Sequence, residues 1–240
     1  MRKFTALNSN GTKMIDFIIA AKSKSTRVPN KNWRPFHNEL CLVDINIEKL
    51  ISAGIAPESI YVSCDDAAIA MPVVERWGVE FIRRDSELCE NHVSLTKCMR
   101  EIAAQVPGQN NIGWCHVVDP LFDEYRACID QFEKNDGHDS LVVAHAWKGH
   151  LMTPSGQPIG WSFGEHHTIS QHLPAFMTMP FCFSILTRSC IKEFGYYVGK
   201  TPYWFQSHGH HVDINTELDF AIAQHAYKAT SAYFETKTNQ

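Results

Sequence analysis

Apolar residues in this 240-residue chain follow two periods that alternate along its first 146 residues. Short, mainly apolar runs are typical of strands buried on both faces of a sheet. Between them, apolar residues recur at intervals of three and four, which is the spacing of one helix face. This alternation predicts an α/β fold with a largely parallel sheet. The expected strands are residues 15–21, 60–62, 79–82, 112–118 and 141–146, and the helical stripes are 42–51, 95–106 and 125–132.

Local signals predict where several helices begin. Ser94 directly precedes the second stripe and is a good N-cap. Thr216 and Asp219 have the spacing of a capping box, which predicts that the last helix begins there. Pro72 follows the second expected strand, so either a helix begins at this proline or the residues before it form a separate turn. The buried face of the last helix is expected to carry Phe220, Ala223 and Tyr227.

The alternation stops between residues 147 and 180. This segment contains glycine, proline and histidine without a clear period, and it is too long for a plain loop in a compact domain. An arm, a flap or a subunit contact is expected instead. Strand character returns at residues 181–186, and no linker divides the chain. We therefore expect residues 1–240 to form a single domain with an inserted arm.

Charge and composition exclude several classes of protein. The formal net charge is −4, which argues against a nucleic-acid partner. No apolar stretch approaches the ~20 residues of a membrane span, and residues 1–14 lack the apolar core of a signal peptide. The eight cysteines contain no CxxC spacing, so reduced packing thiols in a cytoplasmic protein are expected. The 13 histidines include clusters at 166–167 and 208–211, each either a metal site or a polar loop.

Positive charge gathers in the loop after the first expected strand. Lys22, Lys24, Arg27 and Lys31 lie within ten residues, with hydroxyl and backbone N–H groups between them. This combination suits a polyphosphate, which requires charge neutralisation and several donors at once. The residue order differs from that of a Walker A loop. A solvated basic surface loop is the alternative that these residues leave open.

Two aspartates lie where ligands bind in α/β proteins, at the carboxyl ends of strands. Asp119 ends the fourth expected strand, and Asp213 comes just before the last helix. Mg²⁺ takes one or two carboxylates together with water and phosphate oxygens. The pair therefore predicts a magnesium site facing the cationic loop, although either aspartate alone would also serve as a helix cap. Asp65 and Asp66 are expected to be caps or nucleotide contacts.

Taken in order, these motifs resemble the CMP-sugar-acid synthetases, the cytidylyltransferases that activate sialic acids, related nonulosonates and KDO. Residues 25–29, Ser-Thr-Arg-Val-Pro, are similar to the KDO-synthetase form of the nucleotide loop, and residues 30–32, Asn-Lys-Asn, to the sialate form. Residues 62–66, Val-Ser-Cys-Asp-Asp, resemble the second strand of that family with its acidic end. Residues 212–220, Val-Asp-Ile-Asn-Thr-Glu-Leu-Asp-Phe, resemble its signature before the last helix.

The resemblance implies a three-layer, doubly wound, Rossmann-like nucleotidyltransferase fold of the GT-A type. It implies that residues 147–180 form a protruding dimerisation arm of a homodimer. The implied reaction transfers a cytidylyl group from CTP to a small acidic acceptor and releases pyrophosphate, with Mg²⁺ as cofactor. Lys22, Arg27 and Lys31 would be the catalytic cations, and Asp119 and Asp213 the metal ligands. The implied nucleotide contacts are Lys22, Ser23, Ser25, Thr26, Arg27, Lys31, Asn32, Asp65 and His116.

Several positions depart from the pattern of this family. Lys22 replaces the usual arginine, Ser23 and Lys24 replace loop glycines, and Asn215 replaces a metal-binding aspartate of the sialate branch. Charged residues that bind the acceptor in that branch are also missing, so an unusual sugar acid or a phosphonate is expected as acceptor. Two alternatives remain: a preference for another nucleoside triphosphate, or a nucleotide-binding protein without activity. The candidate acceptor contacts are Gln171, His172, His208, His210 and His211.

Overall fold

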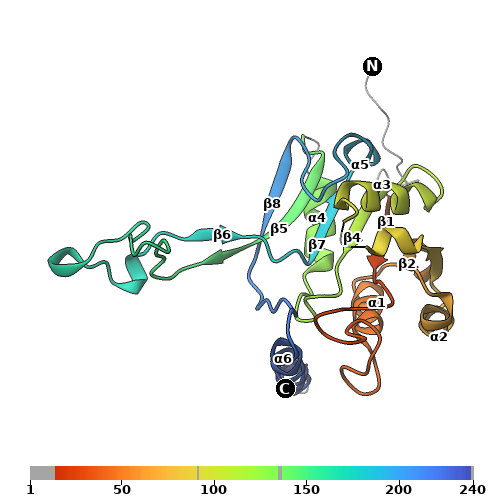
Figure 1. The fold of residues 1–240 in the computed structure, drawn as a ribbon, viewed down its shortest axis with the longest axis horizontal. Helices are drawn as coiled ribbons and strands as arrows, with labels where there is room; N and C mark the ends of the chain where they lie inside the picture. The colour runs from red at the N-terminus through yellow and green to blue at the C-terminus, as the bar shows by residue number, and fades with distance from the viewer. Residues whose placement is uncertain (1–13, 91, 135–136, 239–240) are drawn as a thin grey trace.

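The fold is built around one eight-stranded sheet (Figure 1). The computed structural model describes residues 14–90, 92–134 and 137–238, with side chains described to residue 230. The strands are β1 (Ile15–Ala20), β2 (Ile60–Cys64), β3 (Glu80–Arg83), β4 (Asn111–Cys115), β5 (Ser140–Trp147), β6 (Phe176–Thr178), β7 (Phe183–Leu186) and β8 (Pro202–Ser207). The helices are α1 (Leu42–Ser52), α2 (Ala67–Trp77), α3 (Leu95–Gln105), α4 (Tyr125–Lys134), α5 (Arg188–Phe194) and α6 (Glu217–Thr238).

The strand order is β3-β2-β1-β4-β7-β5-β6, and β8 also pairs with β5. Pairs β1–β2, β2–β3, β1–β4 and β5–β8 are parallel. Strand β7 runs antiparallel to both β4 and β5, so β5 has the same direction as β4, and β6 is antiparallel to β5. The predicted, largely parallel α/β sheet is therefore confirmed.

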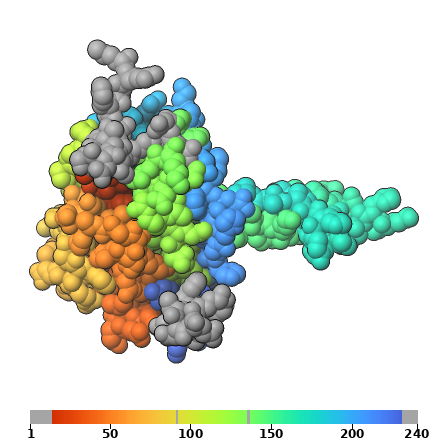
Figure 2. Space-filling view, turned by 180° about the vertical axis from the view of Figure 1, so that it is seen from behind, coloured from red at the N-terminus to blue at the C-terminus, as the bar shows by residue number. Residues whose placement is uncertain are grey.

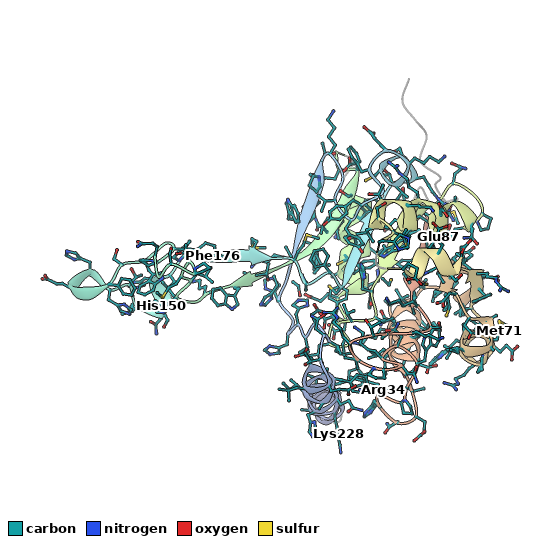
Figure 3. The ribbon with its side chains drawn as sticks, in the orientation of Figure 1. Arg34, Met71, Glu87, His150, Phe176 and Lys228 are labelled. Carbon is teal, nitrogen blue, oxygen red and sulfur yellow. The ribbon has the colours of Figure 1, made fainter. Side chains whose placement is uncertain are left out.

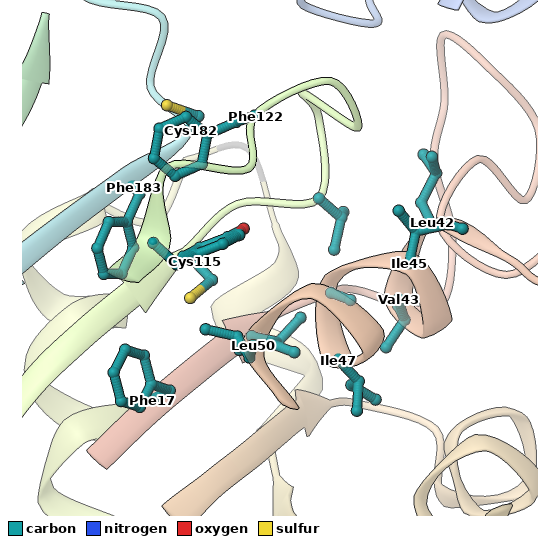
Figure 4. Packing of buried hydrophobic residues seen from close by; sticks show 14 of the residues in the cluster. Phe17, Leu42, Val43, Ile45, Ile47, Leu50, Cys115, Phe122, Cys182 and Phe183 are labelled. Carbon is teal, nitrogen blue, oxygen red and sulfur yellow. The ribbon is translucent and has the colours of Figure 1, made fainter. Parts of the chain in front are cut away.

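Helices cover both faces of this sheet. Neighbouring residues of a strand point to opposite faces, so apolar strands offer apolar side chains to helices on each side. Phe17 and Ile19 of β1 pack with apolar residues of α1, α4 and α6, whereas Ile18 packs with α3 and α5. Figure 4 shows the first of these layers, where Leu50 of α1 lies over the sheet near Phe17. Two apolar layers, one on each face, confirm the three-layer architecture.

The predicted helix starts agree with the structure except at Pro72. The Ser94 hydroxyl accepts a hydrogen bond from the Lys97 N–H at 3.2 Å. Thr216 and Asp219 bond reciprocally as a capping box, with the Thr216 N–H donating to the Asp219 carboxylate at 2.7 Å. Both alternatives for Pro72 are wrong, because this proline lies inside α2. The helix tolerates it because Pro72 and Ala68 are exposed, so water can bond the carbonyl that the missing N–H leaves unpaired.

Between β5 and β7 the chain forms an arm that projects far from the sheet (Figures 1 and 2). The projection begins as a ribbon in which Trp147 pairs with Phe176, and Figure 3 labels Phe176 and His150 along it. Further out, the Trp161 ring contacts those of His150, Phe163 and His167. The arm carries exposed apolar side chains, which suit a contact with a second subunit. The homodimer itself remains a prediction. These side chains are Met152, Ile159, Phe163, Ile169 and Met177.

All eight cysteines are free thiols, and six of them are buried. Most of the buried ones belong to the two apolar layers, which fits the packing role expected of them. None of the helices in the described ranges is long and apolar enough to cross a membrane.

Candidate functional site

A cavity of about 510 Å³ opens at the carboxyl ends of β1 and β4. These neighbouring strands flank the point where the chain order of the sheet reverses, which is where open α/β sheets bind ligands. The cavity therefore lies where the sequence places the phosphate loop. Its lining residues are Ala20, Lys22, Ser25, Thr26, Arg27, Val28, Lys31, Asn32, Arg84, Leu95, Cys98, Trp114, His116, Val117, Val118, Tyr197 and Asn215.

The loop after β1 is held to β2 by a pair of hydrogen bonds. The backbone N–H and the hydroxyl of Ser23 donate to the Asp65 carboxylate at 2.7 and 2.6 Å. Burial raises the pKa of Asp65, but these bonds outweigh it and hold the pKa below its usual value. Ser23 and Asp65, which were expected to contact nucleotide, therefore position the loop and do not line the cavity.

A tight turn directs Lys31 inward. Asn30 has φ of +52°, a left-handed conformation that asparagine tolerates. The Lys31 ammonium then donates to the Ile214 carbonyl at 2.6 Å and joins the loop to the segment before α6. Burial, with the charges of Arg27 and Lys22, lowers the pKa of Lys31, while Asp213 opposes this. Lys31 is thus a partly desolvated cation close to two others, which favours an anionic ligand.

Arg84 is a fourth cation of the cavity, which the sequence analysis missed. It directly follows β3, and its guanidinium donates to the Ser63 carbonyl at 3.2 Å. The signal that would have found it is its position, since Arg84 follows a strand just as Lys22 follows β1. Among the described lining residues there are four lysines and arginines and no aspartate or glutamate, so the cavity attracts anions.

Aromatic rings also line the cavity. Trp114, His116 and Tyr197 line it, and the rings of His116 and Tyr197 lie 4.8 Å apart. Burial lowers the pKa of His116 to about 4, so the ring is neutral at pH 7. Among the described residues, no hydrogen-bond partner faces Trp114 Nε1, His116 Nε2 or Asn32 Oδ1, which are all buried. Unsatisfied buried polar atoms are rare, so these three favour a polar ligand that would bond them.

The structure separates the two aspartates expected to bind metal. Val118 lines the cavity, whereas Asp119, only 3% exposed, lies 2.6 Å from His211 Nδ1 and accepts a hydrogen bond from the Val212 N–H at 3.2 Å. Asp213 is exposed, and its carboxylate accepts a bond from the Asn215 amide at 2.6 Å. Because Asn215 lines the cavity and Asp213 acts electrostatically on Lys31, Asp213 lies at the rim. The structure does not bring Asp119 to the cavity.

The candidate acceptor residues do not line the cavity either. Gln171 and His172 are exposed on the arm, while His208 and His210 are exposed in the loop after β8. His211 is largely buried against Asp119. The structure therefore does not bring these five side chains together at the cavity.

Solved structures of several nucleotidyltransferases have this fold. A CMP:2-keto-3-deoxy-manno-octonic acid synthetase complexed with CTP matches 91% of this chain and 99% of its own, with a TM-score of 0.64 and 12% identity. HddC from Yersinia pseudotuberculosis matches 89% of this chain and 100% of its own, with a TM-score of 0.60 and 12% identity. The 4-diphosphocytidyl-2C-methyl-D-erythritol synthase from Anaerococcus prevotii gives a TM-score of 0.60 at 10% identity over 90% and 96% of the two chains.

These likenesses define the class: the chain has the Rossmann-like fold of nucleotidyltransferases. The sequence narrows it further, since residues 17–118 match a family model described as Cytidylyltransferase. The resemblance is thereby confirmed over residues 17–118, the part of the chain that carries the cationic loop. No protein with a curated description matches the sequence significantly.

Proposed function

We propose that this protein is a cytidylyltransferase that transfers CMP from CTP to an acidic acceptor, an unusual sugar acid or a phosphonate, and releases pyrophosphate. The observation that carries this proposal is the cavity itself. Its lining combines the cations Lys22, Arg27, Lys31 and Arg84 with aromatic rings and unsatisfied buried polar atoms. A nucleoside triphosphate combines a polyanionic chain with a planar, polar base, which matches this lining.

The reaction needs charge stabilisation more than covalent chemistry. An acceptor oxygen attacks the α-phosphorus, and the bond from that phosphorus to the leaving pyrophosphate oxygen breaks. Negative charge builds on the α-phosphoryl oxygens and on pyrophosphate, so fixed cations lower the barrier. Lys22, Arg27 and Lys31 would provide them. Because Lys31 also holds the Ile214 carbonyl, its ammonium is already positioned before a ligand binds.

A magnesium ion fits this site through the triphosphate. The cavity offers no carboxylate among its described lining residues, but Asp213 lies at the rim beside the Asn215 amide. One carboxylate is enough, because Mg²⁺ completes its octahedron with phosphate oxygens and water. When bound, the ion would neutralise charge on the phosphates. Asp213 would hold it, and Asp119 would support the segment from the other side.

The arm is proposed to complete the acceptor site in a homodimer. Its exposed apolar residues suit a subunit contact, and Gln171 and His172 would then meet the acceptor in the site of the partner subunit. His208 and His210 precede the segment that carries Asp213 and are the acceptor candidates from the same chain.

The test is a pyrophosphate-release assay that pairs each nucleoside triphosphate with sugar acids and phosphonates, with and without Mg²⁺. Release that requires CTP, an acidic acceptor and Mg²⁺ is the expected result. Release with another triphosphate but not with CTP would contradict the base preference. CTP binding without release would support the second candidate, a nucleotide-binding protein without activity. That candidate is favoured by the uncharged Asn215 in the cavity.

A further inference from the structure

A second cluster of chemically active side chains lies outside the nucleotide cavity. One ligand atom each from Asp119, Cys182 and His211 lies within 4.8 Å of the others. The three residues come from the end of β4, the start of β7 and the loop before α6, so only the folded chain brings them together. Cys182 belongs to the apolar layer of α1, α4 and α6, and Figure 4 shows it beside Phe122. The cluster is buried and lined by aromatic rings.

Hydrogen bonds around the cluster fix the tautomer of His211. The Ser207 hydroxyl bonds the Glu124 carboxylate, which only accepts, so the single hydroxyl proton is committed there. His211 Nε2, 2.8 Å from the same hydroxyl, must then donate to it. A neutral ring consequently has its lone pair on Nδ1, which faces the Asp119 Oδ2 atom at 2.6 Å. Two electron-rich atoms at this distance require a positive charge between them, either a proton or a metal ion.

The donor set is that of a transition-metal site. A carboxylate oxygen, an imidazole nitrogen and a thiolate sulfur are the ligands of Zn²⁺ and related transition metals, whereas Mg²⁺ prefers oxygen alone. We propose that Asp119, Cys182 and His211 bind one divalent transition-metal ion of this class. From the Zn–ligand lengths, neighbouring ligand atoms lie roughly 3.3–3.8 Å apart. Holding the ion therefore requires Asp119 and His211 to separate by less than about 1 Å.

The surroundings are those of a metal-binding histidine. Ligating histidines usually donate their second ring N–H to a fixed acceptor, and here Nε2 donates to Ser207, which is held by Glu124. Asp119 is also oriented, because its Oδ1 atom accepts the backbone N–H groups of Leu121 and Val212 while Oδ2 faces the cluster.

His145 is the candidate for a fourth ligand. It pairs with Ser207 across β5 and β8, and its ring centre lies 5.0 Å from that of His211. Its Nδ1 atom is buried without a hydrogen-bond partner among the described residues. A ring rotation or a small shift toward the ion would satisfy this atom and give the four-coordinate geometry of structural zinc sites.

The binding step is acid–base in character and needs no oxidant or reductant. The Cys182 thiol carries a proton before the ion binds, and a second proton lies between His211 Nδ1 and Asp119. A metal–sulfur bond forms as the S–H bond breaks, the ion replaces the proton between His211 and Asp119, and both protons leave to the buffer. The ion would tie β4, β7 and the segment before α6 together.

Cobalt titration tests the site in the full-length protein, treated first with chelator and checked for retained secondary structure by circular dichroism. One equivalent of Co²⁺ should produce a thiolate-to-cobalt charge-transfer band and the visible bands of tetrahedral cobalt. Zn²⁺ should abolish both by displacing Co²⁺, and Zn²⁺ added to the metal-free protein should release two protons for each ion bound. Cys182→Ser should lose the charge-transfer band, whereas Cys128→Ser, a buried thiol of α4, should keep it. His145→Gln should alter the visible bands while keeping the charge-transfer band.

Three results would overturn the proposal. The first is the absence of a charge-transfer band with excess Co²⁺ in the folded wild-type protein. The second is an unchanged band in Cys182→Ser, which would assign binding to another thiol. The third is an Nδ1-bound proton on His211, seen by nitrogen-15 NMR in the presence of excess Zn²⁺, which would mean that a proton bridges His211 and Asp119. If Cys182→Ser does not fold, the wild-type titration and the NMR experiment still test whether the metal ion binds.

Discussion

Two regions meet at the end of β4, and they treat charge in opposite ways. In the cavity, four cations come together without a carboxylate among the described lining residues. In the buried cluster, Asp119 has all its oxygens occupied by His211 and two backbone N–H groups. The change from one region to the other takes place between consecutive residues, since Val118 lines the cavity and Asp119 does not. Charge that lacks a protein partner indicates a binding site, whereas charge that is fully paired indicates a structural role.

One segment connects the two regions. Residues 207–215 carry His211 into the buried cluster and Asn215 into the cavity. Between them, the Ile214 N–H donates to the Val118 carbonyl at 3.0 Å, and the Ile214 carbonyl accepts from Lys31. The cluster therefore positions the rim of the cavity, and a change in either region should have a distinct effect.

The largest effect on stability is expected from Asp119→Ala. Removing this carboxylate leaves His211 Nδ1 and the Val212 N–H without their partner in a buried place, which should cost about 3–5 kcal/mol of unfolding free energy. Asp213→Ala is the matched control, because this exposed aspartate should change stability by less than about 0.5 kcal/mol while abolishing turnover. Urea unfolding and a turnover assay measure the two effects. Equal stability losses in both variants would remove the distinction between the regions.

The next effect is a pH dependence that comes from the cavity. The pKa of His116 is about 4 in the folded state, because of burial, against roughly 6.5 when unfolded. Below the unfolded value, the unfolded chain binds a proton that the folded chain excludes. The stability from this residue is therefore complete above pH 6.5 and is lost as the pH falls to 4, by about 3 kcal/mol. His116→Gln should flatten that part of the profile in urea unfolding experiments, and exposed His208→Gln should not. Superimposable profiles of stability against pH for wild type and His116→Gln would contradict this role of His116.

Substitutions in the cationic loop are expected to have a smaller effect, which falls on the affinity for CTP and not on stability. Arg27→Ala removes a cavity cation, and bonds to charged groups are worth about 1.5–3 kcal/mol, so the Kd for CTP should rise roughly 10- to 100-fold. Lys24 lies in the same loop but does not line this cavity, and Lys24→Ala should raise the Kd less than about 3-fold. Calorimetric titration measures both constants. Similar losses in the two variants would indicate general attraction by the loop instead of a defined site.

Periodicity in the sequence was sufficient for most of the fold. The sheet core, the capping boxes and the arm follow from apolar spacing and cap residues. Strand β8 and helix α5 were not predicted, because β8 is an edge strand with an exposed Trp204 and α5 is only seven residues long. The fourth expected strand is three residues too long, since β4 ends at Cys115 and residues 116–118 turn toward the cavity.

The sequence predicted which kinds of residue form the site, but not the direction in which their side chains point. Chain position placed Lys22, Arg27 and Lys31 at a strand end, and they line the cavity. The direction in which a side chain points after a strand depends on tertiary contacts. This is why Asp119 meets His211 and Cys182, which are distant in the sequence, and why the role of Arg84 was missed.

The central claim is that the cationic cavity holds a cytidine nucleotide, and a crystal structure with CTP and Mg²⁺ tests it most directly. We expect electron density for the triphosphate beside Lys22, Arg27 and Lys31, with the base beside Trp114, His116 and Tyr197. Density for CTP at another place on the molecule, or an unoccupied cavity at CTP concentrations that saturate binding in solution, would contradict it.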